Sequence, residues 1–97
     1  MNDKKLIESL RTDGRVSDEH VTRWAEAAGL MAAIDAIGRD GVNAIVKIDG
    51  ARTDGQVYTI VLSGAKLGES FFRRDGSDLL SLLQDAIEFY RSTVWLK

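Results

Sequence analysis

The chain has 97 residues, with 13 lysines and arginines against 15 aspartates and glutamates, for a formal net charge of -2. A domain of this length buries roughly 65% of the surface of its unfolded chain, so we expect one domain over residues 1–97. The chain has no cysteine, which excludes disulfides and thiolate zinc sites. The two signs of charge are interspersed, and this argues against a dedicated nucleic-acid binder, because phosphate binding relies on clustered cations.

The distribution of apolar residues also argues against a membrane or export signal. The longest apolar runs are only a few residues, and the N-terminal stretch MNDKKLIESL has charges where a signal peptide needs its apolar segment. We therefore expect a soluble, cytoplasmic protein with no membrane partner.

A short first helix is predicted near the N-terminus. Asn2 or Asp3 can cap it, and Gly14 follows as a stop signal. Its apolar stripe is narrow, so the helix needs to pack against another element to be stable. The stripe consists of Leu6, Ile7 and Leu10.

A second helix is predicted to begin at Ser17, with acidic residues in its first turn. Apolar residues recur at three- and four-residue spacing as far as Ile37, so one helix over residues 17–37 is the simplest prediction. Gly29 leaves an alternative open. Glycine costs about 1 kcal/mol in a helix interior, so the segment could instead form two helices joined by a tight turn.

Three strands are predicted next. From Val42 the period changes to two, with Ile45 the one apolar residue on the otherwise polar face. A polar turn over residues 50–55 indicates a hairpin into residues 56–63, which are apolar on both faces and belong in the middle of a sheet. A third strand is predicted over residues 67–73, where Phe71 and Phe72 point to opposite faces.

A last helix is predicted from Ser77 to about Arg91, with Ser77 or Asp75 as its cap and an apolar face broad enough to cover a sheet. The apolar tail around Trp95 is expected to pack back on the domain or to meet a partner. The predicted fold class is therefore α+β, in the order α-α-β-β-β-α. The helices pack on one face of a three-stranded antiparallel meander, and Ile45 lies on the other face.

The sequence contains no recognisable catalytic, cofactor or metal motif. His20 is the only histidine, and its flanking sequence gives no serine–histidine–aspartate arrangement. Asp49 and Asp54 share a glycine-rich loop, but the alternating oxygen ligands of a calcium-binding loop are missing, and turn chemistry explains them better. We expect a protein that is not an enzyme and that has no catalytic, cofactor-binding or metal-ligating residue.

One segment resembles a DNA-binding family. Residues 6–30 are similar to the opening of winged-helix regulators of the feast/famine type, in which a helix ending in Asp-Gly-Arg and a serine cap precede a helix ending in Gly-Leu. Asp13-Gly14-Arg15, Ser17 and Gly29-Leu30 take those places. The resemblance implies DNA binding. In place of a recognition helix, however, residues 31–37 are apolar and acidic, whereas base contacts require Arg, Lys, Asn or Gln.

Candidate partner-binding residues come from the strands and the tail. Arg73 and Arg74, with Lys66 nearby, are the closest approach to a basic spot. Aromatic residues are enriched in binding hot spots and serve as stacking platforms for single-stranded nucleic acid. The predicted partner-binding residues are Tyr58, Phe72, Arg73, Arg74 and Trp95.

Two functional hypotheses follow. The first is a non-catalytic protein-binding module, such as a small inhibitor, immunity or accessory protein of a bacterium or phage, with a homodimer as one of its forms. The alternative is nucleic-acid binding, through the winged-helix-like N-terminus or through a basic sheet edge. The two differ in salt dependence, because phosphate contacts weaken steeply with ionic strength and an apolar interface does not.

Overall fold

The computed structural model describes residues 3–97 and confirms the α+β class. Three helices precede the sheet and one follows it. Their bounds are α1 Asp3–Thr12, α2 Asp18–Ala25, α3 Ala28–Arg39, β1 Asn43–Ile48, β2 Tyr58–Ser63, β3 Phe72–Gly76 and α4 Leu79–Tyr90. A short 3-10 turn, Ala65–Leu67, joins β2 to β3, and α4 continues into one π-helical turn, Arg91–Trp95.

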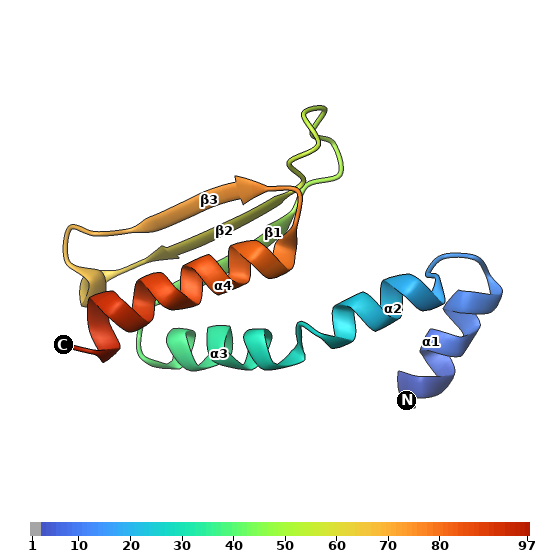
Figure 1. Cartoon of the computed structure of the whole chain (residues 1–97), viewed down its shortest axis with the longest axis horizontal. Helices are drawn as coiled ribbons and strands as arrows, with labels where there is room; N and C mark the ends of the chain where they lie inside the picture. Colours follow the sequence, from blue (N-terminus) through green and yellow to red (C-terminus); the bar gives the residue numbers. More distant parts are fainter. Residues whose placement is uncertain (1–2) are drawn as a thin grey trace.

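The sheet is an antiparallel meander in the order β1-β2-β3, as predicted (Figure 1). In the middle of the sheet, Ile60 of β2 lies between Val46 of β1 and Arg74 of β3. Ile60 and Leu62 have no exposed surface, because this β2 face is covered by helix while its backbone is paired on both sides. The prediction of a central strand is confirmed.

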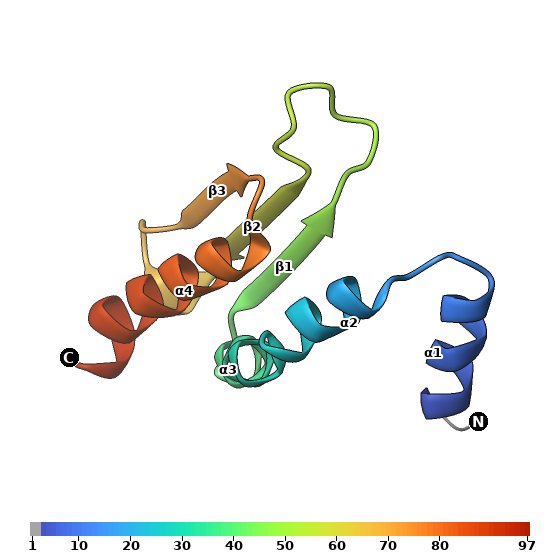
Figure 2. The ribbon, with the colours of Figure 1, turned by 45° about the vertical axis from the view of Figure 1, so that its right-hand side comes forward.

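The core lies between the sheet and two helices, α3 and α4, which pack on one of its faces (Figures 1 and 2). α4 covers β2 and β3, and α3 packs against α4 and β1. No helix of residues 3–97 packs on the outer sheet face, and Ile45 is exposed on it as expected. The buried apolar residues of the core are Ala27, Ile34, Ile37, Val42, Ile60, Leu62, Leu67, Phe72, Leu79, Leu82, Leu83, Ala86 and Tyr90.

The segment predicted as one helix over residues 17–37 forms two helices, α2 and α3, separated by Glu26 and Ala27. Both residues keep right-handed φ angles, -66° and -82°, but their ψ angles of -20° and -10° tighten the turn. The apolar repeat therefore continues across the break with little change of phase, and this is why the spacing alone suggested one helix. Gly29 does not form the break but lies in the first turn of α3.

The third strand begins later than predicted, at Phe72 and not at Leu67. Leu67 is instead buried in the 3-10 turn, between Gly64 at φ 137° and Gly68 at φ 63°. Such positive φ values are accessible to glycine and end the turn on either side. Phe72 is buried and Phe71 is exposed, so their opposite directions are confirmed.

The N-cap of α4 is Asp78, and neither Ser77 nor Asp75 takes that place. The Asp78 side chain makes no capping hydrogen bond. Its Oδ1 lies 2.8 Å from Nη2 of Arg23 in α2, and this ion pair ties α2 to the start of α4.

The C-terminal tail packs back on the domain, which was one of its two predicted outcomes. Trp95 Nε1 donates to Asp40 Oδ2 at 2.9 Å, and the Trp95 ring meets Tyr90 edge-on with centroids 5.1 Å apart. The Tyr90 hydroxyl donates to the same Asp40 oxygen at 2.9 Å. These two hydrogen bonds hold the pKa of Asp40 below its ordinary value, and burial followed by the contact with Asp40 raises the pKa of Tyr90 to about 12.

The N-terminal part projects from the rest of the chain (Figures 1 and 2). We name residues 3–25 (α1 and α2) the arm and residues 27–97 the body. α1 and α2 bury none of their described residues. The radius of gyration is 15.5 Å, whereas a compact chain of this length would have about 12.5 Å. The arm is therefore responsible for an extended shape of 47 × 33 × 18 Å.

Candidate functional site

An apolar hollow of about 350 Å³ opens between the arm and the far end of β1. We name it the arm groove. α1 contributes one side chain to its lining, the loop and α2 contribute four, and β1 contributes one. These are Ile7, Val16, His20, Val21, Trp24 and Ile48. All but His20 are apolar or aromatic, so the arm groove suits an apolar side chain better than a charged or polar ligand.

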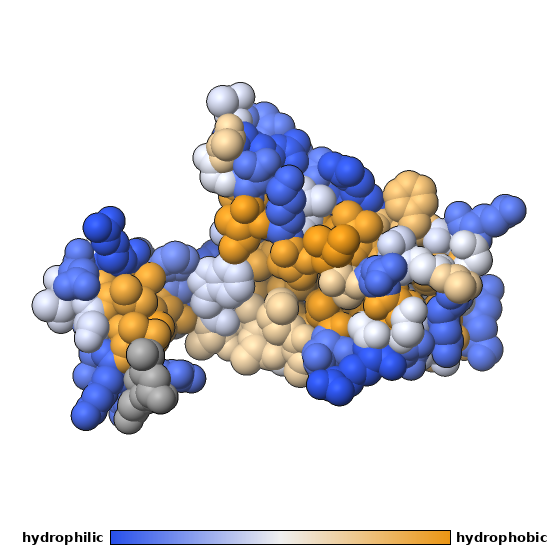
Figure 3. Space-filling view, turned by 180° about the vertical axis from the view of Figure 1, so that it is seen from behind, coloured by the Kyte–Doolittle hydropathy of each residue, from blue (hydrophilic) through white to orange (hydrophobic). Residues whose placement is uncertain are grey.

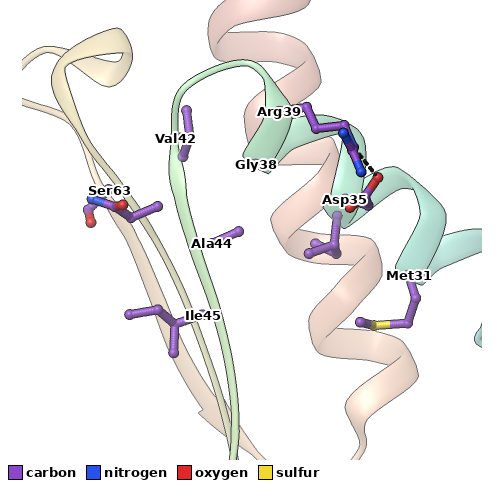
Figure 4. Close-up of a pocket in the computed structure, with 10 residues that line it drawn as sticks. Met31, Asp35, Gly38, Arg39, Val42, Ala44, Ile45 and Ser63 are labelled. Atoms are coloured by element: carbon purple, nitrogen blue, oxygen red, sulfur yellow. Dashed lines mark hydrogen bonds and ion pairs between the residues drawn. The ribbon is translucent and has the colours of Figure 1, made fainter.

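A second hollow of about 600 Å³, the body groove, lies between α3 and β1 (Figure 4). Figure 4 shows Ala44 pointing towards α3, Ile45 on the other side of β1, and Arg39 paired with Asp35 at the rim. The Arg39 Nε and Asp35 Oδ2 atoms are 2.8 Å apart. The lining residues are Met31, Ile34, Asp35, Gly38, Arg39, Val42, Asn43, Ala44, Ile45 and Ser63.

One side of the molecule, seen in Figure 3, carries exposed apolar surface both on the arm and across the body. Three of the residues that line the grooves are large apolar side chains with much of their surface in solvent: Ile48 of the arm groove at 62%, and Met31 and Ile45 of the body groove at 37% and 51%. Single exposed apolar residues are normal on a protein surface, but apolar side chains that line a groove are typical of an interaction site. This side of the molecule is the candidate functional site.

The free edge of β1 runs through this site. The Asp49 N–H donates to the Val57 carbonyl at 2.7 Å, and bonding partners alternate along an antiparallel pair. The odd-numbered residues of β1 therefore bond to β2, and the backbone groups of Ala44, Val46 and Ile48 face outward. An open strand edge of this kind is a template for further pairing, and Lys47 is its one charged residue.

The predicted aromatic residues lie apart from one another. Tyr58 pairs with Gly76 and Phe72 pairs with Leu62, so they occupy opposite ends of the sheet. Phe72 is buried, with its ring 5.4 Å from that of Phe89 in α4. Tyr58 is half-buried and lines a small cavity of about 70 Å³ with His20, Trp24 and other residues of the arm and α4.

The predicted basic residues do not form one cluster. Arg73 and Arg74 are neighbours in a strand and point to opposite faces. Arg74 lies over the Phe72 ring at 5.6 Å and its Nη1 is 3.1 Å from Asp85 Oδ2. Arg73 Nη2 is 3.8 Å from Asp75 Oδ1. Each arginine is thus beside a carboxylate, which reduces the positive potential available to a phosphate.

The outer face of the sheet carries a polar network around Asp75. The Thr59 hydroxyl and the Arg52 guanidinium both reach Asp75 Oδ1, with Arg52 Nη1 at 3.2 Å. The Thr59 hydrogen bond is the largest cause that lowers the pKa of Asp75, and Arg52 adds to it. Arg52 also contacts Asp54 at 3.2 Å. The network therefore joins the β1–β2 loop to β3, and this structural role accounts for its charged residues.

His20 is exposed on the arm, and its backbone N–H donates to the Ser17 hydroxyl at 3.0 Å, which caps α2. It lies at the rim of the arm groove. Within residues 3–97, no three histidine, aspartate or glutamate side chains gather where they could hold a metal ion. No helix in the same range is both long and apolar enough to cross a membrane.

Most residues of the candidate site were recognised in the sequence only as helix stripe or strand face. Val21 and Trp24 fit the core-facing period of a helix, and Ile48 fits the apolar face of β1. The one earlier signal was the narrow stripe of the first helix, which indicated that α1 needs a partner element. Comparison with protein families, with curated proteins and with solved structures finds no match for this chain.

Proposed function

We propose that the protein is a non-catalytic protein-binding module, of the kind exemplified by small bacterial or phage inhibitor, immunity and accessory proteins, acting in the cytoplasm. The observation that carries the proposal is the arm: α1 and α2 bury none of their described residues, and beyond the contact of Trp24 with the core their apolar side chains line the open arm groove. Helices of 10 and 8 residues are too short to be stable alone in water. A partner that covers the apolar side supplies the missing packing.

The binding surface is the side that contains the arm groove, the body groove and the free edge of β1. Its centre is apolar, and charged residues such as Asp35 and Arg39 lie at its rim. A protein interface has the same anatomy, with an apolar centre and a polar rim. Trp24 is the aromatic side chain of the arm groove and is the expected hot spot.

A pair of neighbouring substitutions tests the proposal. Val21 lines the arm groove, whereas the adjacent Thr22 is exposed and does not line it. Tagged wild-type protein, Val21→Glu and Thr22→Glu are used for affinity capture from the native cells, with and without nuclease, and the captured proteins are identified by mass spectrometry. We expect the same partner with wild type and Thr22→Glu under both conditions, and its loss with Val21→Glu.

Two results would contradict the proposal. Equal recovery of every captured protein by Val21→Glu and Thr22→Glu would remove the arm groove from the interaction. Recovery that disappears after nuclease treatment would favour the nucleic-acid alternative, and substitution of Arg73 and Arg74 would then be the next experiment.

A further inference from the structure

The sheet has two edges, and they differ in how well charge protects them. β3 carries three charged side chains among its five residues, Arg73, Arg74 and Asp75, whereas β1 has Lys47 alone among its six. Charged side chains on an edge strand discourage pairing with another strand, and a largely apolar edge invites it. β1 lies at one end of the strand order (Figure 2), so its free edge is the one open to a further strand.

The backbone groups on the free edge of β1 form a symmetric set. Ala44, Val46 and Ile48 direct their N–H and C=O groups away from β2, because the odd-numbered residues bond to β2. When a second β1 is laid antiparallel with Val46 opposite Val46, Ala44 of each copy lies opposite Ile48 of the other. All three outward positions then form hydrogen-bonded pairs. No other antiparallel register of β1 on itself pairs all three.

The side chains of β1 fit the same register. Ala44 points towards α3 (Figure 4), and Ile48 shares that face, so a large exposed side chain of one copy meets a small one of the other. On the outer face, Ile45 meets Lys47 of the second copy, whose aliphatic stem covers the isoleucine while its ammonium stays in solvent. Asp49 lies 3.6 Å from Lys47 in the same chain and offsets the charge of the lysine near the axis.

We propose that β1 pairs with β1 of a second copy of this chain, antiparallel and centred on Val46, so that two three-stranded sheets become one continuous sheet. The contact is isologous, because each strand gives and receives the same hydrogen bonds. Main-chain hydrogen bonds supply the affinity, as in other cases of strand addition, and the side chains select the partner strand. This inference rests on the proposed function, since it names the partner of the same protein-binding side.

Single-cysteine variants map the register, because the chain has no cysteine of its own. In the proposed pair the two Val46 Cα atoms are about 5.5 Å apart, which is within the range of a disulfide. Ile48 is the more exposed residue, but its two copies are four residues apart, about 14 Å along the strand. We therefore expect Val46→Cys to form a disulfide-linked dimer under mild oxidation and Ile48→Cys to remain monomeric on a non-reducing gel.

A mixture of two variants tests the flanking pairs. Neither Ala44→Cys nor Ile48→Cys lies opposite itself, so neither is expected to crosslink alone. In the proposed register the two residues lie opposite each other, and an equimolar mixture should give a disulfide-linked heterodimer. Intact mass spectrometry identifies it, because the two chains differ in mass. Denaturation midpoints verify that each variant is folded.

Two substitutions of Ile45 test the pairing without a covalent bond. Ile45→Lys and Ile45→Glu remove the same exposed side chain and differ in the charge that they place opposite Lys47 of the second copy. Like charges directly opposite destabilise a strand pair, and opposite charges stabilise it. In sedimentation equilibrium we expect wild type to approach twice the chain mass of 10.7 kDa. We expect the dissociation constant of Ile45→Lys to exceed that of Ile45→Glu by about fivefold or more.

Three results would overturn the inference. These are a wild-type chain that stays monomeric at every concentration, crosslinking of Ile48→Cys as readily as Val46→Cys, or equal dissociation constants for Ile45→Lys and Ile45→Glu. If the chain is monomeric but Val21→Glu still loses a captured protein of another kind, the inference fails and the proposed function stands. A monomeric chain for which Val21→Glu captures everything that Thr22→Glu does would contradict both.

Discussion

In the body, the apolar stripe of α4 packs against β2 and β3, and five of its residues are buried. In the arm, the apolar stripes of α1 and α2 bury none. Both regions have the same helical spacing of apolar residues. The difference shows that periodicity tells which side of a helix is apolar, and that only the rest of the fold tells whether the same chain covers that side.

The largest expected effect contrasts a core residue with an arm residue. Ile60→Ala should reduce the free energy of unfolding by about 2 to 5 kcal/mol, because it leaves a cavity in the centre of the sheet. Leu6→Ala should change the unfolding of a dilute, monomeric sample by about 0.5 kcal/mol or less. Urea denaturation followed by far-UV circular dichroism measures both, and equal midpoints for Ile60→Ala and wild type would refute the central-strand assignment.

The tail should behave as part of the body. Truncation after Thr93 removes Trp95, its contact with Tyr90 and its hydrogen bond to Asp40. The expected loss is about 1 to 3 kcal/mol, because an aromatic pair adds to the apolar area that is buried. The denaturation midpoint measures the loss. An unchanged midpoint would mean that the tail contributes nothing to the body.

Acid should destabilise the body through Asp75. Its pKa is lowered in the folded state, chiefly by the Thr59 hydroxyl and then by Arg52, so the folded protein binds fewer protons there than the unfolded chain. The resulting stability is present above the ordinary value of about 3.9 and is lost as the pH falls below it towards the folded pKa. Asp75→Asn should flatten the loss of stability below about pH 4, as measured by denaturation at several pH values. An identical acid slope would contradict the role of Asp75.

The smallest expected effect is in the arm. His20→Ala should alter the stability of the body by about 0.5 kcal/mol or less, because the side chain is exposed and the capping bond uses the backbone N–H of this residue. Ser17→Ala removes the cap itself and should lower the helical content of the arm while the body still unfolds at its usual denaturant concentration. A shift of the body midpoint with either variant would show that arm and body unfold together.

Much of the fold could be predicted because it depends on local patterns. The alternation from Val42 onward gave β1, and the unbroken apolar run gave β2 its central place. Two helices joined by a tight turn were the open alternative for residues 17–37, but the position of the break, at Glu26 and Ala27, could not be predicted, since helical φ angles on both residues keep the apolar repeat in phase. The start of β3 was missed because Leu67 owes its burial to a turn between two glycines with positive φ.

The candidate site was harder to predict than the fold. Trp24 has the spacing of a core residue and does pack partly against the core, so its spacing gave no sign that it also lines the arm groove. Ile48 belongs to the apolar face of β1, yet α3 does not extend far enough to cover it, and it remains 62% exposed. Exposure of this kind depends on the relative lengths and positions of elements distant in sequence. Conversely, Phe72 was expected at a partner surface but is buried against Phe89.

Hydrogen exchange by mass spectrometry would most directly test whether the arm depends on a partner for its stability. Peptides covering residues 3–25 and residues 28–97 are compared in a dilute sample and in a concentrated one. We expect the body to be protected in both samples and the arm to exchange faster than the body in the dilute sample, where no partner covers it. Arm protection equal to that of the body in a dilute, monomeric sample would contradict the claim that the arm is a binding element.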